Sequence, residues 1–177
     1  MIPQRIEAMF FENKEDLIIP AQDVAVLRVE HQVQHAMLIL STSFTKLPVL
    51  DDEDHVRGAL TMRTIIKHAM TNTGYNLDAI ADMKVGDILE EDVGIVPDDV
   101  DMEVLLRKLQ DSNFVCVVDS DAKFVGIITR KEVMARINRI FHTMDVRFEL
   151  KDRDQQSFVE GYGNFFEKNR ALRSAGV

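Results

Sequence analysis

The sequence predicts an α/β (α+β) fold of two tandem repeats, each a small sheet with helices on one face, packed as a pseudo-twofold pair. Three observations favour this fold: an internal repeat, apolar runs of strand length in each copy, and helical spacing of apolar residues beside them. A copy of about 60 residues is too small to bury a large core alone. The two copies are therefore expected to pack face to face and to leave a cleft between them.

The internal repeat relates LPVLDDEDHVRGALTMRTII, which begins at Leu47, to VCVVDSDAKFVGIITRKEVM, which begins at Val115. The offset is 68 residues without a gap, and it places Gly58 opposite Gly126. Upstream, VAVLRVEHQV matches VGIVPDDVDM after a slip of one residue. Because residue types, spacing and glycines agree together, both copies are expected to fold alike.

Each copy is predicted to run strand, helix, strand, turn, strand, helix. The strands are short apolar or β-branched runs bounded by polar residues. They are Val24–Leu27, Leu47–Leu50 and a strand that ends at Leu60 in copy one, and Val93–Val96, Phe114–Val118 and a strand that ends at Ile128 in copy two.

The helices are predicted from apolar residues that recur every three to four positions. The first helix of each copy has one apolar face, formed by Val33, Ala36, Met37 and Leu40 in copy one and by Val100, Val104, Leu105 and Leu109 in copy two. The last helices are expected at about Thr61–Met70 and at Arg130–Phe141, the latter with a wide stripe of Val133, Met134, Ile137, Ile140 and Phe141.

These elements divide the chain into an N-terminal helix (1–20), a first repeat (21–85), a second repeat (86–145) and a C-terminal extension (146–177). The segment from Pro3 to Leu17 is expected to be one amphipathic helix that packs on the repeats or on a second subunit. The extension is polar at first and then carries aromatic residues at near-helical spacing. It is predicted to be a weak helix that docks on a partner, with disorder as the alternative.

The composition excludes several classes of protein. One cysteine excludes a disulfide scaffold, and no apolar run reaches the roughly 20 residues that cross a bilayer. The N-terminus lacks the pattern of a signal peptide, so a cytoplasmic protein is expected. The net charge of −9 argues against non-specific duplex binding, whereas five Lys or Arg between Arg130 and Arg147 suit a small anionic ligand.

No pattern of catalysis or metal binding stands out. His31 and His35 form an H-x-x-x-H pair, but both are expected on the solvent face of a helix without a third ligand, so no metal is predicted. Cys116 lies within an apolar strand and is expected to be an inert buried thiol. Nucleophile–base pairs and glycine-rich phosphate loops are not found, and a non-catalytic protein without a cofactor is expected.

The repeat resembles a tandem pair of CBS domains, a Bateman module, from Val24 to about Asn138. The carrying features are the LPVLD and VCVVD strands, the glycines Gly58 and Gly126, taken to lie in turns, and the segments GALTMRT and GIITRKE. The strings AxLxxxxxxxHAxxxL and FVCV, with TRK opening the last helix, are most similar to the cyclic di-AMP-binding CbpB/DarB group of Gram-positive bacteria. The resemblance implies an adenosine-type ligand in the cleft between the repeats.

The start of the last helix is the predicted phosphate-binding end of this cleft. A helix N-terminus offers free N–H groups and the positive end of the helix dipole. Thr129, Arg130 and Lys131 add a hydroxyl and two cations, and cations placed there oppose the dipole, which favours an anion nearby. Thr129 and Glu132 also form a T-x-x-E capping box, and capping alone explains Glu132.

The base-binding residues are implied by the resemblance. They are Asp23, Ala25 and Leu27 on the first strand, and Phe44 and Thr45 before the next strand. Ala25 is small enough for a purine to approach the backbone. Leu27 and Phe44 are expected to belong to the core first and to line the ligand second.

The matching positions of copy one, Thr61, Arg63 and Thr64, are candidates for a second cleft. CBS proteins that bind linear adenine nucleotides usually carry an aspartate three residues after this threonine, where this chain has Thr64 and Glu132. The departure favours a cyclic dinucleotide held through cations and backbone, although Glu132 can still accept a hydrogen bond from a ribose.

The predicted function is that of a homodimeric sensor that binds cyclic di-AMP and regulates partner enzymes through ligand-dependent contact. The resemblance implies a protein target such as an alarmone synthetase or a metabolic enzyme. The composition indicates neither a nucleic acid nor a membrane as a partner. Two alternatives stay open: a sensor of AMP, ADP, ATP or S-adenosylmethionine, and a ligand-free dimerisation adaptor. Arg130→Ala is expected to weaken nucleotide binding and to leave stability almost unchanged.

Overall fold

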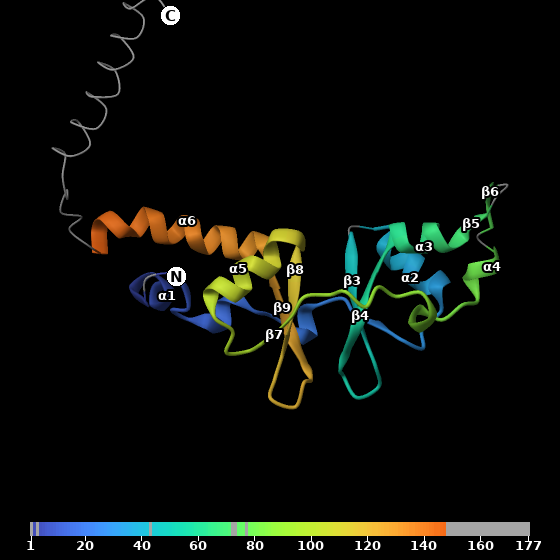
Figure 1. The fold of residues 1–177 in the computed structure, drawn as a ribbon, viewed down its shortest axis with the longest axis horizontal. Helices are drawn as coiled ribbons and strands as arrows, with labels where there is room; N and C mark the ends of the chain where they lie inside the picture. Colours follow the sequence, from blue (N-terminus) through green and yellow to red (C-terminus); the bar gives the residue numbers. More distant parts are fainter. Residues whose placement is uncertain (1, 3, 43, 72–73, 77, 148–177) are drawn as a thin grey trace, which may run out of the picture. The chain divides into compact units, whose positions relative to one another are not determined.

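The computed structural model describes residues 2, 4–42, 44–71, 74–76 and 78–147 (Figure 1). Its contacts divide the chain into one unit from Met1 to Ile140 and another from Phe141 to Val177. The first unit holds both repeats, and of the second the structure describes the end of one helix. The aromatic residues that were predicted to dock in the C-terminal extension lie outside the described residues.

The first repeat is built on a three-stranded sheet. The strands β2 (Leu27–Arg28) and β3 (Lys46–Leu50) run parallel and are connected through α2 (Val33–Leu40). β3 then pairs antiparallel with β4 (Val56–Thr61), and α3 (Met62–Ala69) follows directly. The helical crossover is needed because a tight turn can join only antiparallel strands.

The second repeat has the same order of elements. β7 (Ile95–Pro97) and β8 (Phe114–Val118) run parallel and are connected through α5 (Met102–Asp111). β9 (Phe124–Thr129) returns antiparallel to β8, and α6 (Arg130–Arg147) follows. The predicted α/β fold of two tandem repeats is therefore confirmed.

The remaining elements lie outside this repeated pattern. They are α1 (Gln4–Phe10), β1 (Ile19–Pro20), β5 (Met70–Thr71), β6 (Gly74–Tyr75), α4 (Asp78–Ala81), and the 3-10 helices Lys14–Leu17, Ala21–Asp23 and Val85–Asp87. Within the part of the chain that the structure describes, no helix is both long enough and apolar enough to span a bilayer.

Each repeat receives a crossing segment from elsewhere in the chain. β1 precedes the first repeat but pairs antiparallel with β9 of the second, where Ile19 stands opposite Ile127. In the same way Glu90 precedes β7, the first strand of the second repeat, and bridges Ala59 on β4, with backbone hydrogen bonds of 2.8 Å in both directions. Since Ala59 and Ile127 are equivalent under the internal repeat, the two crossings are reciprocal and join the two repeats as a pseudo-twofold pair.

Gly58 and Gly126 make these crossings possible. The prediction that they lie in turns is wrong, because both lie within the strands β4 and β9. A Cβ atom on Gly58 would overlap the carbonyl oxygen of Glu90, and one on Gly126 would overlap that of Ile19. Both glycines are therefore required for the close approach of two backbones.

The hydrophobic core is shared by the two repeats. One cluster of buried residues belongs to the first repeat and includes Leu27, Val49 and Leu60. A second cluster joins two residues of the first repeat to four of the second half, namely Leu50 and Ala59 to Val93, Phe114, Cys116 and Phe124. The repeats therefore bury apolar surface against each other, as expected for units too small to fold around separate large cores.

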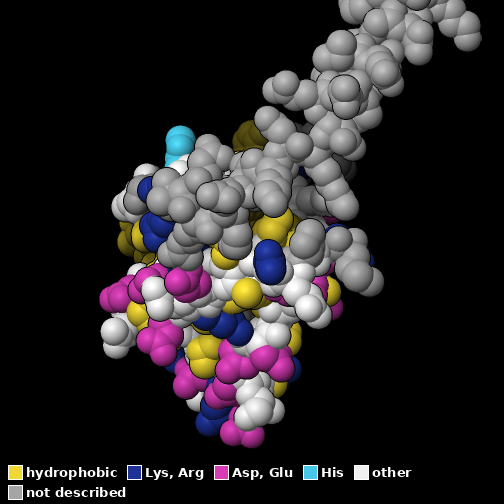
Figure 2. Space-filling view, turned by 90° about the vertical axis from the view of Figure 1, so that its left-hand side faces the viewer, with side chains coloured by type: hydrophobic (Ala, Val, Ile, Leu, Met, Phe, Trp, Pro, Cys, Tyr) yellow, Lys and Arg dark blue, Asp and Glu magenta, His cyan; other side chains and the backbone are white. Residues whose placement is uncertain are grey.

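The two hairpins turn in the same way. Asp51 Oδ1 accepts hydrogen bonds of 2.9 Å from the backbone N–H groups of Glu53 and His55, and Asp119 repeats this arrangement in the second hairpin. His55 also bridges Lys123, so the hairpin tips lie side by side. In Figure 2, Asp and Glu side chains gather toward the lower end of the visible face, the end at which the hairpins lie in Figure 1.

Asp51 makes the stability of the first hairpin dependent on pH. Burial raises the pKa of this carboxyl, but the N–H groups of His55 and Glu53 and the Arg57 guanidinium outweigh burial and hold the pKa below 3.8. The stabilising contribution is therefore present above pH 3.8 and is lost as the pH falls through the lowered pKa. Asp51→Asn is expected to flatten the acid side of the melting temperature against pH in thermal scans. An unchanged acid slope would contradict this role.

Ala122 adopts a left-handed backbone conformation, with φ of 61°, at the tip of the second hairpin. Asp54 has the equivalent position and a φ of 67° in the first hairpin. This conformation costs an L-residue about 1–2 kcal/mol, whereas glycine adopts it freely. Ala122→Gly is expected to raise the free energy of unfolding by about 0.5 kcal/mol, after the greater entropy of glycine in the unfolded chain is subtracted. Urea denaturation measures the change, and a lower free energy of unfolding would contradict the expectation.

The first strand of each repeat starts later than predicted. β2 begins at Leu27 rather than Val24, because Ala21–Asp23 forms a 3-10 turn and only Leu27 and Arg28 reach the parallel register with β3. Val24 instead packs on the shared core cluster. β7 likewise covers Ile95–Pro97 rather than Val93–Val96.

Three residues that were predicted to be buried are exposed. Val104, Met134 and Phe141 expose 41%, 59% and 66% of their surface. In α6 a buried position is taken by Arg136 instead, whose guanidinium donates to the carbonyl oxygens of Glu12 (2.7 Å) and Asn13 (3.1 Å). A buried arginine is tolerated here because its N–H groups have acceptors.

The N-terminal segment docks on the second repeat in two pieces rather than as one helix. α1 ends at Phe10, and Asn13, with φ of 54°, precedes the 3-10 helix Lys14–Leu17. Phe10 and Leu17 are fully buried, and Glu7 Oε1 accepts a hydrogen bond of 3.2 Å from the N–H of Met102 on α5. The segment leads directly into β1 and therefore sets the position of Ile19.

Candidate functional site

Two adjoining cavities lie where the two repeats meet. The larger, of about 720 Å³, is lined by Ile19, Thr45, Asn113, Phe114, Thr129, Arg130, Lys131, Glu132 and Met134. The smaller, of about 270 Å³, is lined by Ile19, Asp23, Val24, Ala25, Phe44, Thr45, Lys46, Leu47, Pro48, Phe114 and Ile127. Because Ile19, Thr45 and Phe114 line both, the cavities share a wall, and together they are large enough for a small-molecule ligand.

The structure gathers most of the site residues that the sequence predicts around these cavities. The predicted phosphate end lines the larger cavity, and the predicted base end lines the smaller one; the residues are Thr129, Arg130, Lys131 and Glu132, and Asp23, Ala25, Phe44 and Thr45. The prediction that Leu27 lines the ligand site is wrong. This residue lines neither cavity and is fully buried in the core of the first repeat, because β2 begins there and pairs Leu27 with Val49.

The N-terminus of α6 opens on the larger cavity. Thr129 ends β9, and its Oγ1 accepts a hydrogen bond of 3.1 Å from the N–H of Glu132. The hydroxyl therefore caps the helix, as the T-x-x-E pattern predicts. The helix that follows is 18 residues long, so the positive end of a full helix dipole faces the cavity wall.

Arg130 has a structural role in addition to its place on the cavity wall. Its Nε donates to the carbonyl oxygen of Leu109 (2.9 Å), and its Nη2 donates to those of Gln110 (3.1 Å) and Ser112 (2.8 Å). These carbonyls end α5 and have no partner within that helix. A guanidinium has five N–H groups, so the two on Nη1 remain for another acceptor.

Lys131 differs from Arg130 in its surroundings. It is exposed, lines the larger cavity, and makes no hydrogen bond or ion pair with the described residues. The walls of the two cavities hold three cations, Lys46, Arg130 and Lys131, against two carboxylates, Asp23 and Glu132. A positive wall in a chain of net charge −9 favours an anionic ligand.

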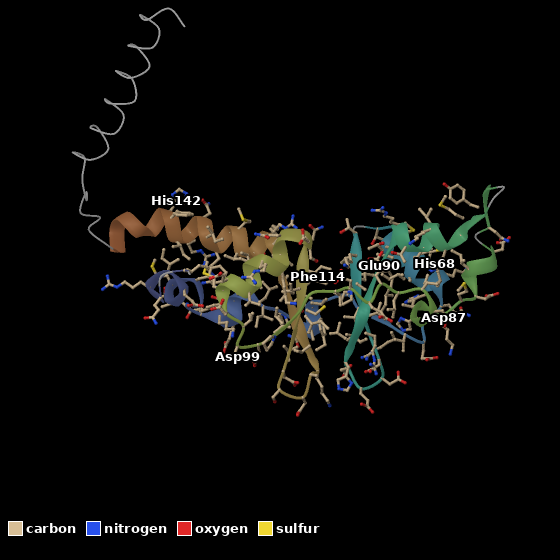
Figure 3. All side chains as sticks on the ribbon, in the orientation of Figure 1. His68, Asp87, Glu90, Asp99, Phe114 and His142 are labelled. Carbon is tan, nitrogen blue, oxygen red and sulfur yellow. The ribbon has the colours of Figure 1, made fainter. Side chains whose placement is uncertain are left out.

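Sequence reasoning missed nine of the lining residues, which include Ile19, Lys46, Asn113 and Phe114. Asn113 corresponds to Thr45 under the offset of 68 residues, and Phe114 (labelled in Figure 3) corresponds to Lys46. The repeat applied to Thr45 would therefore have found Asn113, whereas Phe114 matches Lys46, which was itself not predicted. Ile19 carried no such signal, because it reaches the site by crossing from outside the first repeat.

The candidates for a second cleft, Thr61, Arg63 and Thr64, are arranged differently. Thr61 Oγ1 accepts a hydrogen bond of 3.1 Å from the N–H of Thr64 and lies 2.8 Å from Thr64 Oγ1. Thr64 Oγ1 in turn donates to the carboxylate of Glu90. Thr64 is buried and Arg63 is exposed, so the two lie in different surroundings.

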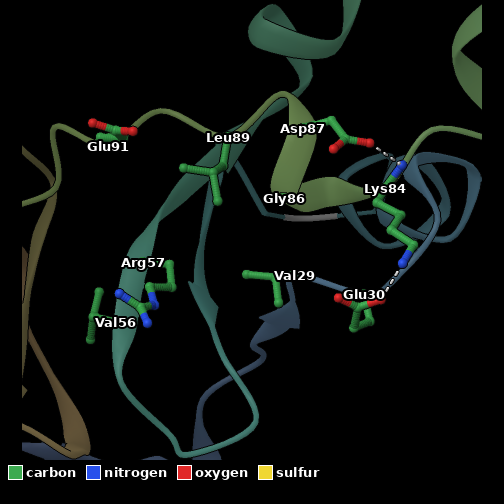
Figure 4. A pocket seen from close by; sticks show the side chains of 9 residues that line it. All are labelled: Val29, Glu30, Val56, Arg57, Lys84, Gly86, Asp87, Leu89 and Glu91. Atoms are coloured by element: carbon green, nitrogen blue, oxygen red, sulfur yellow. Dashed lines mark hydrogen bonds and ion pairs between the residues drawn. The ribbon is translucent and has the colours of Figure 1, made fainter.

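A third cavity, of about 540 Å³, lies on the first repeat (Figure 4). It is lined by Val29, Glu30, Val56, Arg57, Lys84, Gly86, Asp87, Leu89 and Glu91. Both of its cations are paired, since Lys84 Nζ contacts the Glu30 carboxylate and Arg57 Nε donates to Asp51 Oδ2 at 2.8 Å. None of the predicted site residues lines this cavity, and its cations are already neutralised.

The histidines and the cysteine show no metal-binding arrangement. Among the described residues, no three or more His, Cys, Asp or Glu side chains gather as a metal site would require. His31 precedes α2, and its Nδ1 accepts a hydrogen bond of 3.2 Å from the N–H of Arg28; burial, with the charges of His35 and Arg28, lowers its pKa. Cys116 is fully buried, and burial raises its pKa to about 12, as expected for an unreactive thiol.

Comparison with known families explains the repeated architecture. The family model described as CBS domain matches residues 15–71 and 85–139. The chain belongs to the CBS domain family. The two matches cover more than half of the chain and fall on the two structural repeats, so the predicted tandem CBS pair is confirmed.

Several CBS proteins are similar to this chain. Cyclic di-AMP receptor B of Bacillus subtilis (strain 168) is 27% identical over 151 residues, which cover 82% of this chain and 99% of that protein. The CbpB protein of Listeria monocytogenes, solved in complex with c-di-AMP, is 32% identical with a TM-score of 0.66, over 72% of this chain and 96% of that chain. CBSX2, solved in complex with AMP, is 25% identical with a TM-score of 0.58, over 71% of this chain and 96% of that chain. The predicted resemblance to the CbpB/DarB group is therefore confirmed.

Proposed function

We propose that this CBS pair is a non-catalytic sensor that binds cyclic di-AMP in the two adjoining cavities. The observation that carries the proposal is a helix N-terminus with Arg130 and Lys131 in one cavity, joined to a cavity walled by Ala25 and Phe44. A cyclic dinucleotide presents phosphates and adenines close together, and so matches a cationic cavity that adjoins a partly apolar one. The names of the similar B. subtilis and L. monocytogenes proteins support the same ligand.

The lining residues divide into two roles under this proposal. Thr129, Arg130 through Nη1, and Lys131 hold the phosphates, because a hydroxyl, a guanidinium edge and an ammonium are the donors that phosphate prefers. The adenine lies against the small side chain of Ala25 and the ring of Phe44, where backbone groups read its edge and the ring packs on its face. The remaining residues of the smaller cavity, Asp23 and Thr45, offer polar contacts to the base or ribose.

A linear adenine nucleotide is the second candidate. Glu132 lines the larger cavity, where its carboxylate can accept hydrogen bonds from ribose hydroxyls. The similarity to CBSX2, solved with AMP, favours the same class of ligand. A linear nucleotide offers this carboxylate both a 2′- and a 3′-hydroxyl, whereas a cyclic dinucleotide offers 2′-hydroxyls alone, so the contribution of Glu132 should be greater for a linear nucleotide. Glu132→Gln should weaken the binding of a linear nucleotide more than that of cyclic di-AMP.

Calorimetric titration with cyclic di-AMP, beside AMP, ATP and S-adenosylmethionine, tests the proposal. Binding of cyclic di-AMP with a Kd of about 1 μM or below, at least about tenfold tighter than the others, is the expected result. Tighter binding of a linear nucleotide or of S-adenosylmethionine would contradict cyclic di-AMP as the ligand and would identify the tighter-binding compound instead. No binding of any of the four would contradict the sensor proposal and favour a ligand-free dimerisation adaptor.

The proposed sensor is a homodimer. Large apolar side chains are exposed at equivalent positions of the two last helices, Ile66 on α3 and Met134 on α6, and Met70 is exposed at the end of α3. Pairing of these helix faces with a second copy would bury them. Light scattering after size-exclusion chromatography should give about twice the 20.2 kDa mass of the chain. A mass of one chain would contradict the dimer.

Regulation of a partner enzyme is part of the same proposal. If the ligand-free form binds the partner, ligand and partner must weaken each other's binding by the same factor. Capture of a partner by the purified protein without cyclic di-AMP, and its release when the nucleotide is added, is the expected behaviour. Capture that the nucleotide does not change would contradict ligand-dependent regulation.

A further inference from the structure

We infer that Glu90 closes the first repeat to anionic ligands, so that each chain binds one nucleotide, at the second repeat. The inference rests on the proposed nucleotide binding and adds its stoichiometry and the residue that sets it. It follows from a comparison of the two helix starts that the internal repeat makes equivalent.

The two helix starts share their local geometry. Thr61 caps α3 by accepting from the N–H of Thr64, and Thr129 caps α6 by accepting from the N–H of Glu132, both at 3.1 Å. Each helix follows directly on the last strand of its repeat. On geometry alone, both N-termini would offer a ligand the same hydroxyl and helix dipole.

The difference lies in what already occupies the first helix start. Thr64 Oγ1 donates to Glu90 Oε1 and lies 2.8 Å from Thr61 Oγ1, and Thr64 is only 4% exposed. Figure 3 shows Glu90 beside the start of α3. A carboxylate of the chain itself therefore stands at the α3 N-terminus, whereas the equivalent position beside α6 opens on the cavity of about 720 Å³.

Glu90 is placed there by the crossing segment. Its backbone bridges Ala59 on β4 with two hydrogen bonds of 2.8 Å. The equivalent bridge in the second repeat pairs Ile19 with Ile127, so an uncharged side chain stands where Glu90 stands in the first. One charged residue in two equivalent crossings thus distinguishes the two repeats.

The cations reinforce this difference. Met62 occupies in the first repeat the position that Arg130 occupies in the second, so that Arg63 is left without the neighbouring cation that Lys131 has. A phosphate beside α3 would meet one exposed arginine and the carboxylate of Glu90, and like charges repel most strongly where water is excluded. The start of α6 also carries a carboxylate, Glu132, but beside two cations, Arg130 and Lys131. The first repeat therefore lacks the excess of positive charge that the second presents.

Three variants test this inference, titrated calorimetrically with cyclic di-AMP beside the wild-type chain. Met62→Arg supplies the missing cation, Met62→Arg/Glu90→Ala also removes the carboxylate, and Met62→Arg/Glu91→Ala removes an exposed carboxylate one residue along as the matched control. We expect one nucleotide per chain for the wild type, for Met62→Arg and for the control, and two for Met62→Arg/Glu90→Ala. Thermal melts confirm that each variant is folded at the titration temperature.

Two nucleotides per wild-type chain would overturn the inference, and so would one nucleotide per folded Met62→Arg/Glu90→Ala chain. If that variant does not fold, Met62→Arg/Glu90→Gln, which keeps a hydrogen-bond acceptor for Thr64, replaces it under the same criterion of two per chain. Failure of the proposed function gives a different result, because the wild type would then bind no nucleotide at all. That result would also overturn the inference.

Discussion

Gly126→Val is expected to lower the free energy of unfolding by more than about 3 kcal/mol and the melting temperature by about 10 °C. A side chain at this position meets the carbonyl oxygen of Ile19 and, at 2.9 Å, Cγ2 of Ile18. The carbonyl cannot move away without a large loss of stability, because it belongs to the backbone of β1 and β1 is paired with β9. Since Ile19 lines both cavities, the variant should also lose nucleotide binding.

The equivalent variant and a control sharpen this result. Gly58→Val should have a similar effect, because its Cβ would overlap the carbonyl oxygen of Glu90. Lys123→Val places the same side chain at an exposed position of the same hairpin and should change the melting temperature by less than about 2 °C. Thermal unfolding of all three measures the effect. A Gly126→Val chain that melts with the wild type would show that β1 does not lie against β9.

Lys131→Ala and Arg130→Ala are expected to separate ligand binding from stability. Lys131→Ala should weaken the binding of cyclic di-AMP by about 10-fold or more, because a charge-assisted hydrogen bond is lost. It should leave the melting temperature unchanged. Arg130→Ala should weaken binding and also lower the free energy of unfolding by about 1.5–3 kcal/mol, because it removes the donor to three carbonyls at the end of α5. Calorimetric titrations and thermal melts measure the two effects independently.

Two further variants serve as controls for this pair. Lys108→Ala removes a cation from α5 that lines neither cavity and should change binding little. Arg130→Lys keeps the charge but not the planar guanidinium, and should recover part of the binding and little of the stability. Unchanged nucleotide affinity in Lys131→Ala would contradict a phosphate contact. Unchanged stability in Arg130→Ala would contradict the role at the end of α5.

The fold was predictable from the sequence because the internal repeat is local and complete. The offset of 68 residues applies without a gap from Leu47 through the last helix of each copy, so that one pattern of strands and helices accounts for both. The crossings of Ile19 and Glu90 were not predictable in this way. Each pairs with a strand of the other repeat, and sequence spacing carries no information on such pairing. The glycines were recognised as special, but the close approach that requires them depends on those crossings.

The candidate site was predictable where its chemistry is local. The helix start at Thr129 can be identified from capping and charge alone, and the structure shows Thr129 as the cap. The second role of Arg130 was hidden, because it depends on where the C-terminus of α5 lies in space. The sequence therefore suggested that Arg130→Ala would leave stability almost unchanged, and the three carbonyl contacts reverse that expectation. The contact between Glu90 and Thr64 could not be predicted for the same reason, since the two residues are distant in sequence.

A crystal structure of the chain grown with saturating cyclic di-AMP tests the central claim most directly. The predicted result is one nucleotide per chain, with an adenine against Ala25 and Phe44 and phosphate oxygens within hydrogen-bond distance of Thr129, Lys131 and Arg130 Nη1. The α3 N-terminus should still be occupied by Glu90. A nucleotide bound in the third cavity, beside Arg57 and Lys84, or anywhere else outside the two adjoining cavities, would contradict the account.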